Sequence, residues 1–250
     1  MPKFAANLTL LFKELPFLDR FEAAATAGFA AVEVLFPYDD AASEITRRLT
    51  ANNLKMVLIN TPPPNWAGGD RGFGAIAGGQ ARFQHDFRRA VRFAQAFDAT
   101  HLHIMAGKAQ GQVAHQTFVE NLRWAAKQAP AQSLTIEPIN AQDMPGYFLN
   151  DFDQAAAIIA EVGAPNLGLQ FDAYHAEKIT GDLWSTWDTH KAITRHIQVG
   201  GLPDRREPIR GDVDFPAWFR KVDADGYAGW VSGEYHPTAQ TEAGLIWMRG

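Results

Sequence analysis

The chain contains no cysteine among its 250 residues. Disulfide bonds therefore contribute nothing to its stability, and metal sites built from thiolate ligands are excluded. Any metal that the protein binds must take its ligands from oxygen atoms or from imidazole nitrogens.

Long hydrophobic runs are also missing, because no apolar stretch approaches the length needed to span a membrane. The N-terminal segment MPKFAANLTLLFKEL has a short apolar patch that is broken by Asn7 and Lys13, and it has no small-residue cleavage site of the kind found in signal peptides. These features predict a cytoplasmic protein without a membrane partner.

An excess of basic residues is absent as well. The 23 Lys and Arg residues are outnumbered by 28 Asp and Glu residues, which gives a formal net charge of -5, and the basic residues are scattered rather than gathered in a stripe. Proteins that bind nucleic acid usually carry a basic patch, so nucleic acid is disfavoured as a partner. A small molecule is the expected partner.

What the chain does have is a regular alternation of short β-like runs and helical patterns. Its 46% hydrophobic content suffices for a large core, and its length fits either two ordinary domains or one α/β barrel. We expect strands at 4–10, 31–35, 55–59, 101–105, 134–137, 167–172, 193–199 and 230–234. We expect helices at 16–27, 39–53, 80–97, 112–129, 151–162, 215–224 and 238–248, with a less regular one at 175–188.

Eight strand–helix pairs without a composition break typical of a linker predict an α/β fold, a single (β/α)8 TIM barrel over residues 1–250. An open doubly wound sheet is the alternative. It is disfavoured because no G-x-G-x-x-G motif follows the first strand, and because GFGAIAGG at 72–79 has no strand immediately before it.

The segment 61–79, TPPPNWAGGDRGFGAIAGG, has three prolines, six glycines and no periodicity. A loop this long inside a compact domain is either a functional lid or a disordered surface excursion. We favour a lid, because Trp66 and Phe73 are large apolar groups that need something to cover and the glycines would let the chain hinge.

Polar residues stand at the expected strand ends, which is where TIM barrels carry their active sites. In chain order they are Asn7, Glu33, Asn60, His103, Glu137, Asp172, Gln198 and Glu234. The last four come from consecutive strands, which are neighbours in a closed barrel. Their side chains can therefore converge on one point above the barrel axis.

Three carboxylates in one place repel one another unless protons or a cation neutralise them. A divalent metal held by Glu137, Asp172, Gln198 and Glu234 satisfies this requirement. Oxygen ligands favour Mg²⁺, with Mn²⁺ as the alternative, over Zn²⁺. For each residue taken alone, a helix cap or a hydrogen bond to a backbone amide is the ordinary interpretation.

Further residues are candidates for substrate binding. His103 shares one face of its strand with His101, and a packed, hydrogen-bonded histidine is an equally good interpretation of it. His175 stands three residues beyond Asp172, where it either orients substrate and relays a proton or caps a helix. Asn60 is a weaker candidate of the same kind, and Glu33 is closer to a structural role.

The loop Asp204 to Glu207 is a charged cluster that would ordinarily be a solvated turn. An anionic substrate needs a guanidinium nearby, and Arg205 is the first choice for it. Glu207 is a further substrate-binding candidate in this loop.

Four long segments carry a family resemblance. IEPINAQDMPGYFL, LGLQFDAYHAEKITGDL, HIQVGGLPDRREPIRGDVDF and GYAGWVSGEYHPTAQTEAGLIWM resemble the hydroxypyruvate isomerase family within the xylose-isomerase-like barrels. The similarity extends upstream to NTPPPNWAGGDRGF and HLHIMAG, so it covers nearly the whole chain.

The resemblance implies a metal-assisted isomerase of a short hydroxy or keto acid, most simply one that converts hydroxypyruvate to tartronate semialdehyde through an ene-diolate. The glutamates that match Glu137 and Glu234 serve as acid and base, and Asp172 and Gln198 match the other metal ligands. Some relatives isomerise 2-oxo-tetronate acids, so that substrate is an alternative. Ketose 3-epimerases usually carry histidine where this chain has Gln198, which makes that activity a less favoured alternative.

Two other classes stay open. A DNA-repair nuclease related to AP endonucleases would need more histidines around a multi-metal site and a basic face. A non-catalytic acid- or sugar-binding protein would not need the complete set of four ligands. A homo-oligomer is also open, because Trp184, Trp187 and Trp247 fit either a subunit contact or the outer packing of a barrel.

Overall fold

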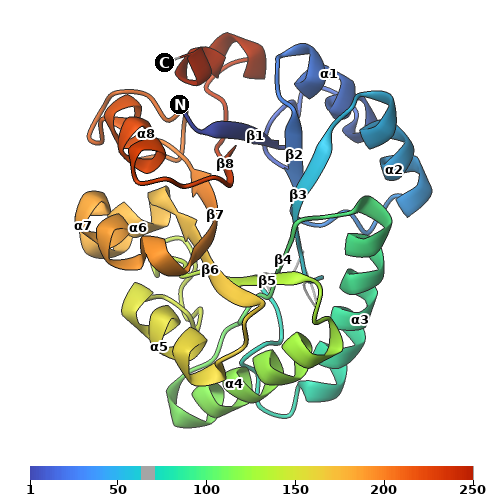
Figure 1. Cartoon of the computed structure of the whole chain (residues 1–250), viewed down its shortest axis with the longest axis vertical. Helices are drawn as coiled ribbons and strands as arrows, with labels where there is room; N and C mark the ends of the chain where they lie inside the picture. The colour runs from blue at the N-terminus through green and yellow to red at the C-terminus, as the bar shows by residue number, and fades with distance from the viewer. Residues whose placement is uncertain (63–70, 250) are drawn as a thin grey trace.

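Eight parallel strands form a closed barrel in the computed structural model, which describes residues 1–62 and 71–249 (Figure 1). Each strand pairs with the next in the sequence, and β1 pairs with β8 through Lys3 and Trp230 to close the ring. The strands are β1 (Lys3–Asn7), β2 (Ala31–Val34), β3 (Lys55–Asn60), β4 (His101–His103), β5 (Ser133–Ile136), β6 (Leu167–Asp172), β7 (Thr194–Val199) and β8 (Trp230–Gly233). The predicted (β/α)8 barrel is confirmed.

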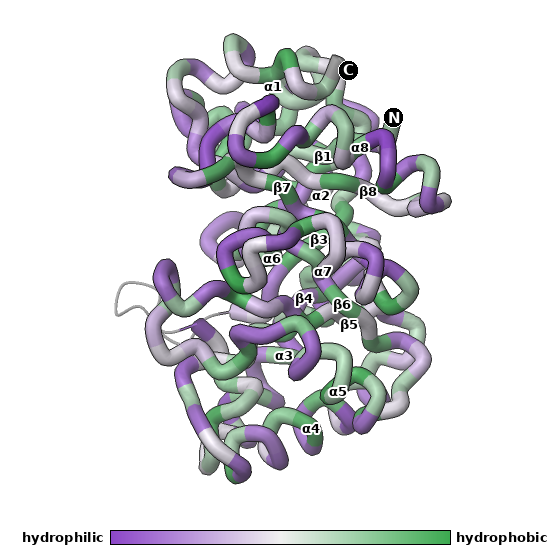
Figure 2. Tube along the Cα trace, turned by 90° about the vertical axis from the view of Figure 1, so that its left-hand side faces the viewer, coloured by the Kyte–Doolittle hydropathy of each residue, from purple (hydrophilic) through white to green (hydrophobic). Residues whose placement is uncertain are grey.

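Helices surround the barrel on its outside (Figure 1). They are η1 (Phe17–Asp19), α1 (Arg20–Thr26), α2 (Ala42–Ala51), α3 (Gln80–Phe97), α4 (Gly111–Gln128), α5 (Phe152–Val162), α6 (Ala173–Thr180), α7 (Leu183–His190), η2 (Lys191–Ile193), α8 (Phe215–Ala224) and η3 (Thr241–Arg249). Hydrophilic and hydrophobic residues alternate along the outer helices, as a helix with one buried face requires (Figure 2). Within the described part of the chain, no helix is both long and apolar enough to cross a membrane.

Acidic caps fix the starts of several helices. The side chain of Asp151 accepts a hydrogen bond from the backbone N–H of Gln154, and that of Asp214 accepts one from Ala217. These bonds satisfy N–H groups that have no partner inside the helix. Gly163 ends α5 in the left-handed conformation that glycine adopts without strain.

Two helix predictions need correction. The irregular helix expected at 175–188 is two helices, because Gly181 ends α6 with a φ of 70° and Asp182 caps α7. The last helix does not begin at 238 and is a 3-10 helix, η3. Its first residue, Thr241, is tied to Glu14 through its backbone N–H, and Gly244 in its middle is a poor helix former.

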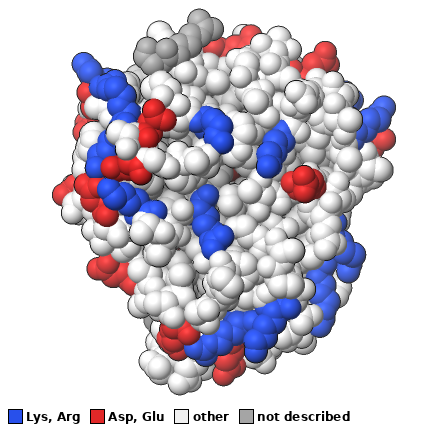
Figure 3. Space-filling model, in the orientation of Figure 1, with Lys and Arg blue, Asp and Glu red and all other residues white. Residues whose placement is uncertain are grey.

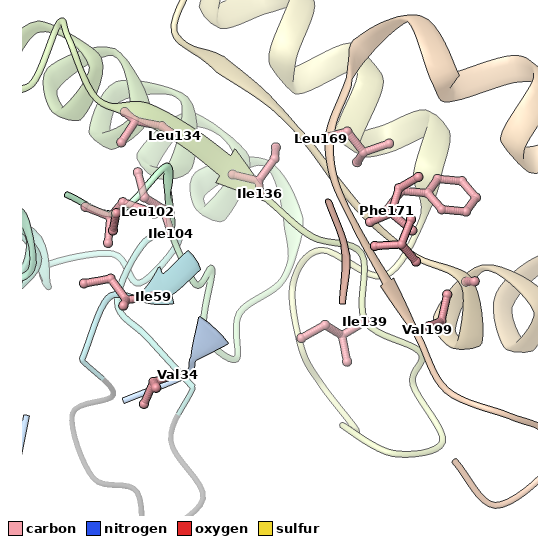
Figure 4. Close-up of a cluster of buried hydrophobic side chains, with 14 of the residues drawn as sticks. Val34, Ile59, Leu102, Ile104, Leu134, Ile136, Ile139, Leu169, Phe171 and Val199 are labelled. Atoms are coloured by element: carbon pink, nitrogen blue, oxygen red, sulfur yellow. The ribbon is translucent and has the colours of Figure 1, made fainter. Parts of the chain in front are cut away.

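The main core lies between the barrel and the helices. Figure 4 shows part of it, with Ile59, Leu102, Leu134, Leu169 and Val199 each contributed by a different strand, from β3 to β7. These residues alternate along their strands with the residues that face the barrel interior.

Two of the three tryptophans that were considered for a subunit contact are part of this core. Trp187 is 1% exposed and Trp247 is 3% exposed, so neither is available for a contact with another chain. Trp184, at 38%, is exposed.

Candidate active site

A pocket of about 610 Å³ opens where the barrel strands end. Each strand supplies a wall residue at or just beyond its own end. In order from β1 to β8 these are Leu10, Leu35, Asn60, Met105, Glu137, His175, Arg205 and Glu234. The carboxyl end of the strands is the end at which TIM barrels place their chemistry.

Besides Glu33, three further strand-end carboxylates are buried at this end of the barrel. Glu137, Asp172 and Glu234 are 5%, 0% and 6% exposed. Burial, reinforced by the charges of Glu234 and Asp172, raises the pKa of Glu137 well above its usual range. Burial also raises the pKa of Asp172, and it raises the pKa of Glu234 to about 8 despite the nearby guanidinium of Arg205. Glu234 can therefore hold a proton near neutral pH, and Glu137 ionises less readily than an exposed glutamate.

The guanidinium of Arg205 sits between two of these carboxylates. Its Nη2 lies 2.7 Å from Oδ2 of Asp172 and 2.9 Å from Oε2 of Glu234. Its Cζ lies 5.1 Å from the centroid of the Tyr174 ring. Burial opposes the charge of Arg205, but the neighbouring carboxylates, Glu234 first, raise its pKa, so it remains a cation. One guanidinium offsets the charge of one carboxylate, so protons or a second cation must balance the others.

The orientation of His175 is set by Asn140. The Oδ1 atom of Asn140 accepts backbone N–H groups from Gln142 and Asp143 at 3.1 and 2.9 Å, which fixes Nδ2 on the opposite side of the amide. That Nδ2 lies 2.7 Å from Nδ1 of His175. Because Nδ2 is a donor, Nδ1 must accept, and the neutral imidazole carries its hydrogen on Nε2.

This tautomer decides what His175 can do. Burial, aided by Arg205, lowers its pKa well below the usual range, so the ring is neutral. Its Nε2 lies 3.6 Å from Oδ2 of Asp172 and 3.9 Å from Oε1 of Glu137. Ligand atoms of these three residues lie within 4.8 Å of one another, as in a metal site. Since Nε2 carries a hydrogen, however, His175 offers a hydrogen-bond donor there and not a ligand lone pair.

Gln198 is held by Glu33, a buried glutamate for which the sequence favours a structural role. Its Nε2 donates to Oε1 of Glu33 at 2.7 Å, and its Oε1 accepts from Nε2 of Gln170 at 2.6 Å. Glu33 also binds Nδ2 of Asn7 and Nε2 of His196, each at 2.7 Å. Glu33 is completely buried, and these partners replace the water that its carboxylate loses on folding.

A second polar layer lies beneath the strand-end residues, and sequence reasoning missed it. Thr135, Gln170, His196 and Ser232 each stand two positions before Glu137, Asp172, Gln198 and Glu234, respectively, and all four are buried. Alternate residues of a strand face the same side. Counting back two positions from each strand end would have found them.

His103 lies between Asn60 and Glu137. Nδ1 of His103 is 3.1 Å from Oδ1 of Asn60 and 3.7 Å from Oε2 of Glu137. Burial lowers the pKa of His103 to about 3, so this ring is neutral too. Asn60 lines the pocket, whereas His103 is completely buried beside it.

Glu207 points elsewhere. Its carboxylate accepts the backbone N–H of Thr238 at 2.8 Å and the hydroxyl of the same residue at 2.7 Å, so it joins two loops rather than reaching the pocket.

The predicted lid falls partly on residues 63–70, which include Trp66 and lie outside the described residues. Phe73 packs against the main core, and Arg71 lines the pocket.

The donor set suits a hard divalent cation. Carboxylate oxygens and an amide oxygen are the ligands that Mg²⁺ and Mn²⁺ prefer. The residues that offer them are Glu137, Asp172, Gln198 and Glu234. A cation would have to compete with Arg205 for two of the carboxylates and share the amide oxygen with Gln170.

Known proteins resemble this chain closely. A family model described as xylose isomerase-like TIM barrel matches residues 21–250. A 2-oxo-tetronate isomerase from Cupriavidus necator is 46% identical over 100% of this chain and 98% of its own, and a hydroxypyruvate isomerase from Escherichia coli is 39% identical over 99% and 98%. A solved structure described as an AP endonuclease, family 2, from Brucella melitensis is 42% identical, with a TM-score of 0.97 over 100% of this chain and 98% of that one.

Proposed function

The chain belongs to the xylose isomerase-like TIM barrel family, and from that premise we propose that it is an isomerase of a short hydroxy or keto acid. Hydroxypyruvate and the 2-oxo-tetronates are the candidate substrates, because the relatives that match over nearly their full length are named for them. The observation that carries the proposal is the pair of buried glutamates, Glu137 and Glu234, that line one pocket. We also infer that the enzyme acts in the cytoplasm.

Three cationic side chains of the pocket, Arg71, Lys178 and Arg205, offer partners to an anionic substrate. They line it together with the carboxylates of Glu137, Asp143, Asp204 and Glu234, and Arg205 is already paired with Glu234. A carboxylate bound among such groups makes charge-assisted hydrogen bonds, which are stronger than those between neutral partners. A neutral sugar would gain less from these residues than a short acid.

Glu137 and Glu234 are the proton-transfer groups in this proposal. One carboxylate removes the hydrogen from the carbon that bears the hydroxyl, which gives an ene-diolate, and a proton returns to the neighbouring carbon from the other glutamate or from the same one. The pKa of both glutamates is raised, to about 8 for Glu234, and a general base works best when its pKa lies near the working pH. His175 donates its Nε2–H to a substrate oxygen and steadies the charge that develops there.

A divalent cation held by Glu137, Asp172, Gln198 and Glu234 would polarise the substrate carbonyl and lower the cost of the ene-diolate. Mg²⁺ is the first choice and Mn²⁺ the second, because the donors are oxygen atoms. Asp172 is fully buried and its Oδ2 is bound by Arg205, so in this proposal it serves the charge balance of the site rather than proton transfer.

The test is to assay Glu137→Gln and Glu234→Gln against hydroxypyruvate, 2-oxo-tetronates and neutral ketoses, with and without Mg²⁺ or Mn²⁺. Loss of a general base typically slows a reaction about 10²- to 10⁴-fold, and exchange of deuterium from D2O into substrate should fall in parallel. Glu207→Gln is the matched control, because its carboxylate binds Thr238 away from the pocket. Wild-type turnover of every acid by both variants would sink the proposal.

The description of the Brucella melitensis structure makes a nuclease the second candidate. On the face shown in Figure 3, Lys and Arg side chains form a band along the lower edge and separate groups elsewhere, with Asp and Glu side chains beside several of them. The net charge of the chain is -5, which disfavours a DNA backbone as a partner. Incubation with a duplex that contains an abasic site separates the two candidates. We expect no cleavage at low or high salt under conditions in which a keto acid is isomerised.

A further inference from the structure

One amide nitrogen beneath the pocket binds groups from two different strands. Nε2 of Gln170, on β6, donates to Oε2 of Glu137 at 3.0 Å and to Oε1 of Gln198 at 2.6 Å. Its own carbonyl oxygen accepts the hydroxyl of Thr135 at 3.0 Å. Both amide hydrogens and the amide oxygen of Gln170 are therefore in use.

The direction of this chain of hydrogen bonds is fixed by its ends. A glutamine amide can be turned end for end, so its orientation has to follow from its partners. Oε1 of Glu33 accepts from Nδ2 of Asn7, whose own Oδ1 accepts the backbone N–H of Thr9, and the same oxygen of Glu33 faces Gln198. Gln198 must therefore turn its NH2 group toward Glu33 and its oxygen toward Gln170.

Gln170 is consequently left with one arrangement. It faces the oxygen of Gln198 on one side and the carboxylate of Glu137 on the other, and a single NH2 group supplies a hydrogen to each. Turning this amide around would set its oxygen against two other oxygens in a buried place, where an unpaired polar atom is costly.

The arrangement makes the two oxygens of Glu137 different. Oε2 is bound by Gln170 below the pocket, whereas Oε1 is the oxygen that lies near His175, which lines the pocket. Oε1 is therefore the atom that is free to take up a proton from substrate.

We propose that Gln170 is the positioning residue of this site: it aims Oε1 of Glu137 into the pocket and holds the Gln198 amide, and buried Glu33 sets the direction of its hydrogen bonds. The inference rests on the proposed function for the role of Glu137, but the geometry itself stands without it. Gln170 is 1% exposed and lies one layer below the strand-end residues, so it acts through Glu137 and Gln198 and not by touching substrate.

The experiment compares Gln170→Met with Gln170→Glu. Methionine has a similar length and cannot donate, and glutamate has nearly the same shape but carries at most one hydrogen where the amide carries two. Removing a group that orients a ligand typically costs about 10- to 100-fold in activity or metal affinity. We expect kcat to fall by that factor in Gln170→Met, with KM changed less than about threefold. The Kd for Mn²⁺ should rise by the same factor. In Gln170→Glu we expect kcat and the affinity for Mn²⁺ to fall by at least the same factor.

The matched control is Gln132→Met. The amide of Gln132 is also partly buried and donates to backbone carbonyls of Ala99 and Thr100, before β4 begins and away from the pocket. This variant should lose some stability and keep kcat. A crystal structure of Gln170→Met should show the carboxylate of Glu137 turned from its wild-type position.

The outcomes separate this inference from the proposed function. If wild-type protein isomerises no acid, the proposed function fails, while the Mn²⁺ affinity and the position of Glu137 still test Gln170. Wild-type kcat in both Gln170 variants, or an unmoved Glu137 carboxylate in Gln170→Met, overturns the positioning role. A rise in KM with unchanged kcat also overturns it, because that pattern belongs to a residue that binds substrate.

Discussion

Nη2 of Arg205 and Oδ2 of Asp172 lie 2.7 Å apart, and the carboxylate that this guanidinium neutralises is completely buried. The same nitrogen reaches Glu234 at 2.9 Å. A divalent cation in this site would draw on the same two carboxylates. Arg205 and the cation therefore compete for them, and Arg205 keeps the site neutralised in part when no cation is bound.

We expect Arg205→Gln to bind Mn²⁺ more tightly than wild type, by at least about tenfold, because a competing positive charge a few ångström away is removed. Without metal the same variant should lose about 3 kcal/mol of stability, since two buried carboxylates lose their partner. Calorimetric titration with Mn²⁺ and urea unfolding measure the two effects. Arg206→Gln is the control, because that side chain binds backbone carbonyls at the surface. Weaker Mn²⁺ binding by Arg205→Gln would contradict the competition.

The strand-end residues could be predicted from sequence because the barrel topology alone determines where the end of each strand lies. Once consecutive parallel strands close into a ring, Glu137, Asp172, Gln198 and Glu234 have to lie at the same end. The predicted helix boundaries agree with the structure where the periodicity is strong, as in α3. They are wrong at η3, where Gly244 weakens the helical pattern.

The orientation of the polar groups could not be predicted in the same way. The tautomer of His175 depends on Asn140, which is 35 positions away, and the direction of the Gln198 amide depends on Glu33, which is 165 positions away. No local sequence pattern indicates hydrogen bonds between residues so far apart in the chain. The place of Arg205 between two carboxylates is likewise a property of the folded site.

Lys178 provides a test of substrate charge. It lines the pocket, and its Nζ donates to Oε1 of Gln142 at 3.3 Å, so it is partly tied but near the substrate. Lys178→Met should raise KM for a keto acid about tenfold, the cost of one charge-assisted hydrogen bond, and should leave kcat nearly unchanged. Steady-state kinetics measure both constants, with Lys127→Met on the exposed face of α4 as control. An unchanged KM would remove Lys178 from the binding site.

The cap of α8 offers a test of stability. Asp214 accepts the backbone N–H of Ala217 at 3.1 Å, and loss of an acidic cap usually costs about 1 kcal/mol. Asp214→Ala should lower the free energy of unfolding by that amount in urea denaturation. Asp212→Ala is the matched control, because Asp212 is an exposed aspartate in the preceding loop. Equal losses in the two variants would show that the cap is not the cause.

His101, which is buried below the site, should make the stability of the protein depend on pH. Burial, aided by His196, lowers the pKa of His101 from 6.5 to about 3. Between these values the unfolded chain binds a proton at His101 that the folded chain does not, so this residue costs stability as the pH falls below about 6.5. The slope is at most about 1.4 kcal/mol per pH unit.

Replacing the imidazole should remove that part of the pH dependence. We expect His101→Gln to lose less stability than wild type between pH 6.5 and pH 5, by about 1 to 2 kcal/mol in urea unfolding. The buried carboxylates of the site act in the opposite direction, because their raised pKa values let the folded chain hold protons, but they are common to both proteins and cancel in the difference. Ser133→Ala removes the hydrogen-bond partner of His101 and leaves its imidazole in place, so it should retain the wild-type slope. Parallel curves for His101→Gln and wild type would mean that His101 takes up no proton on unfolding in this range.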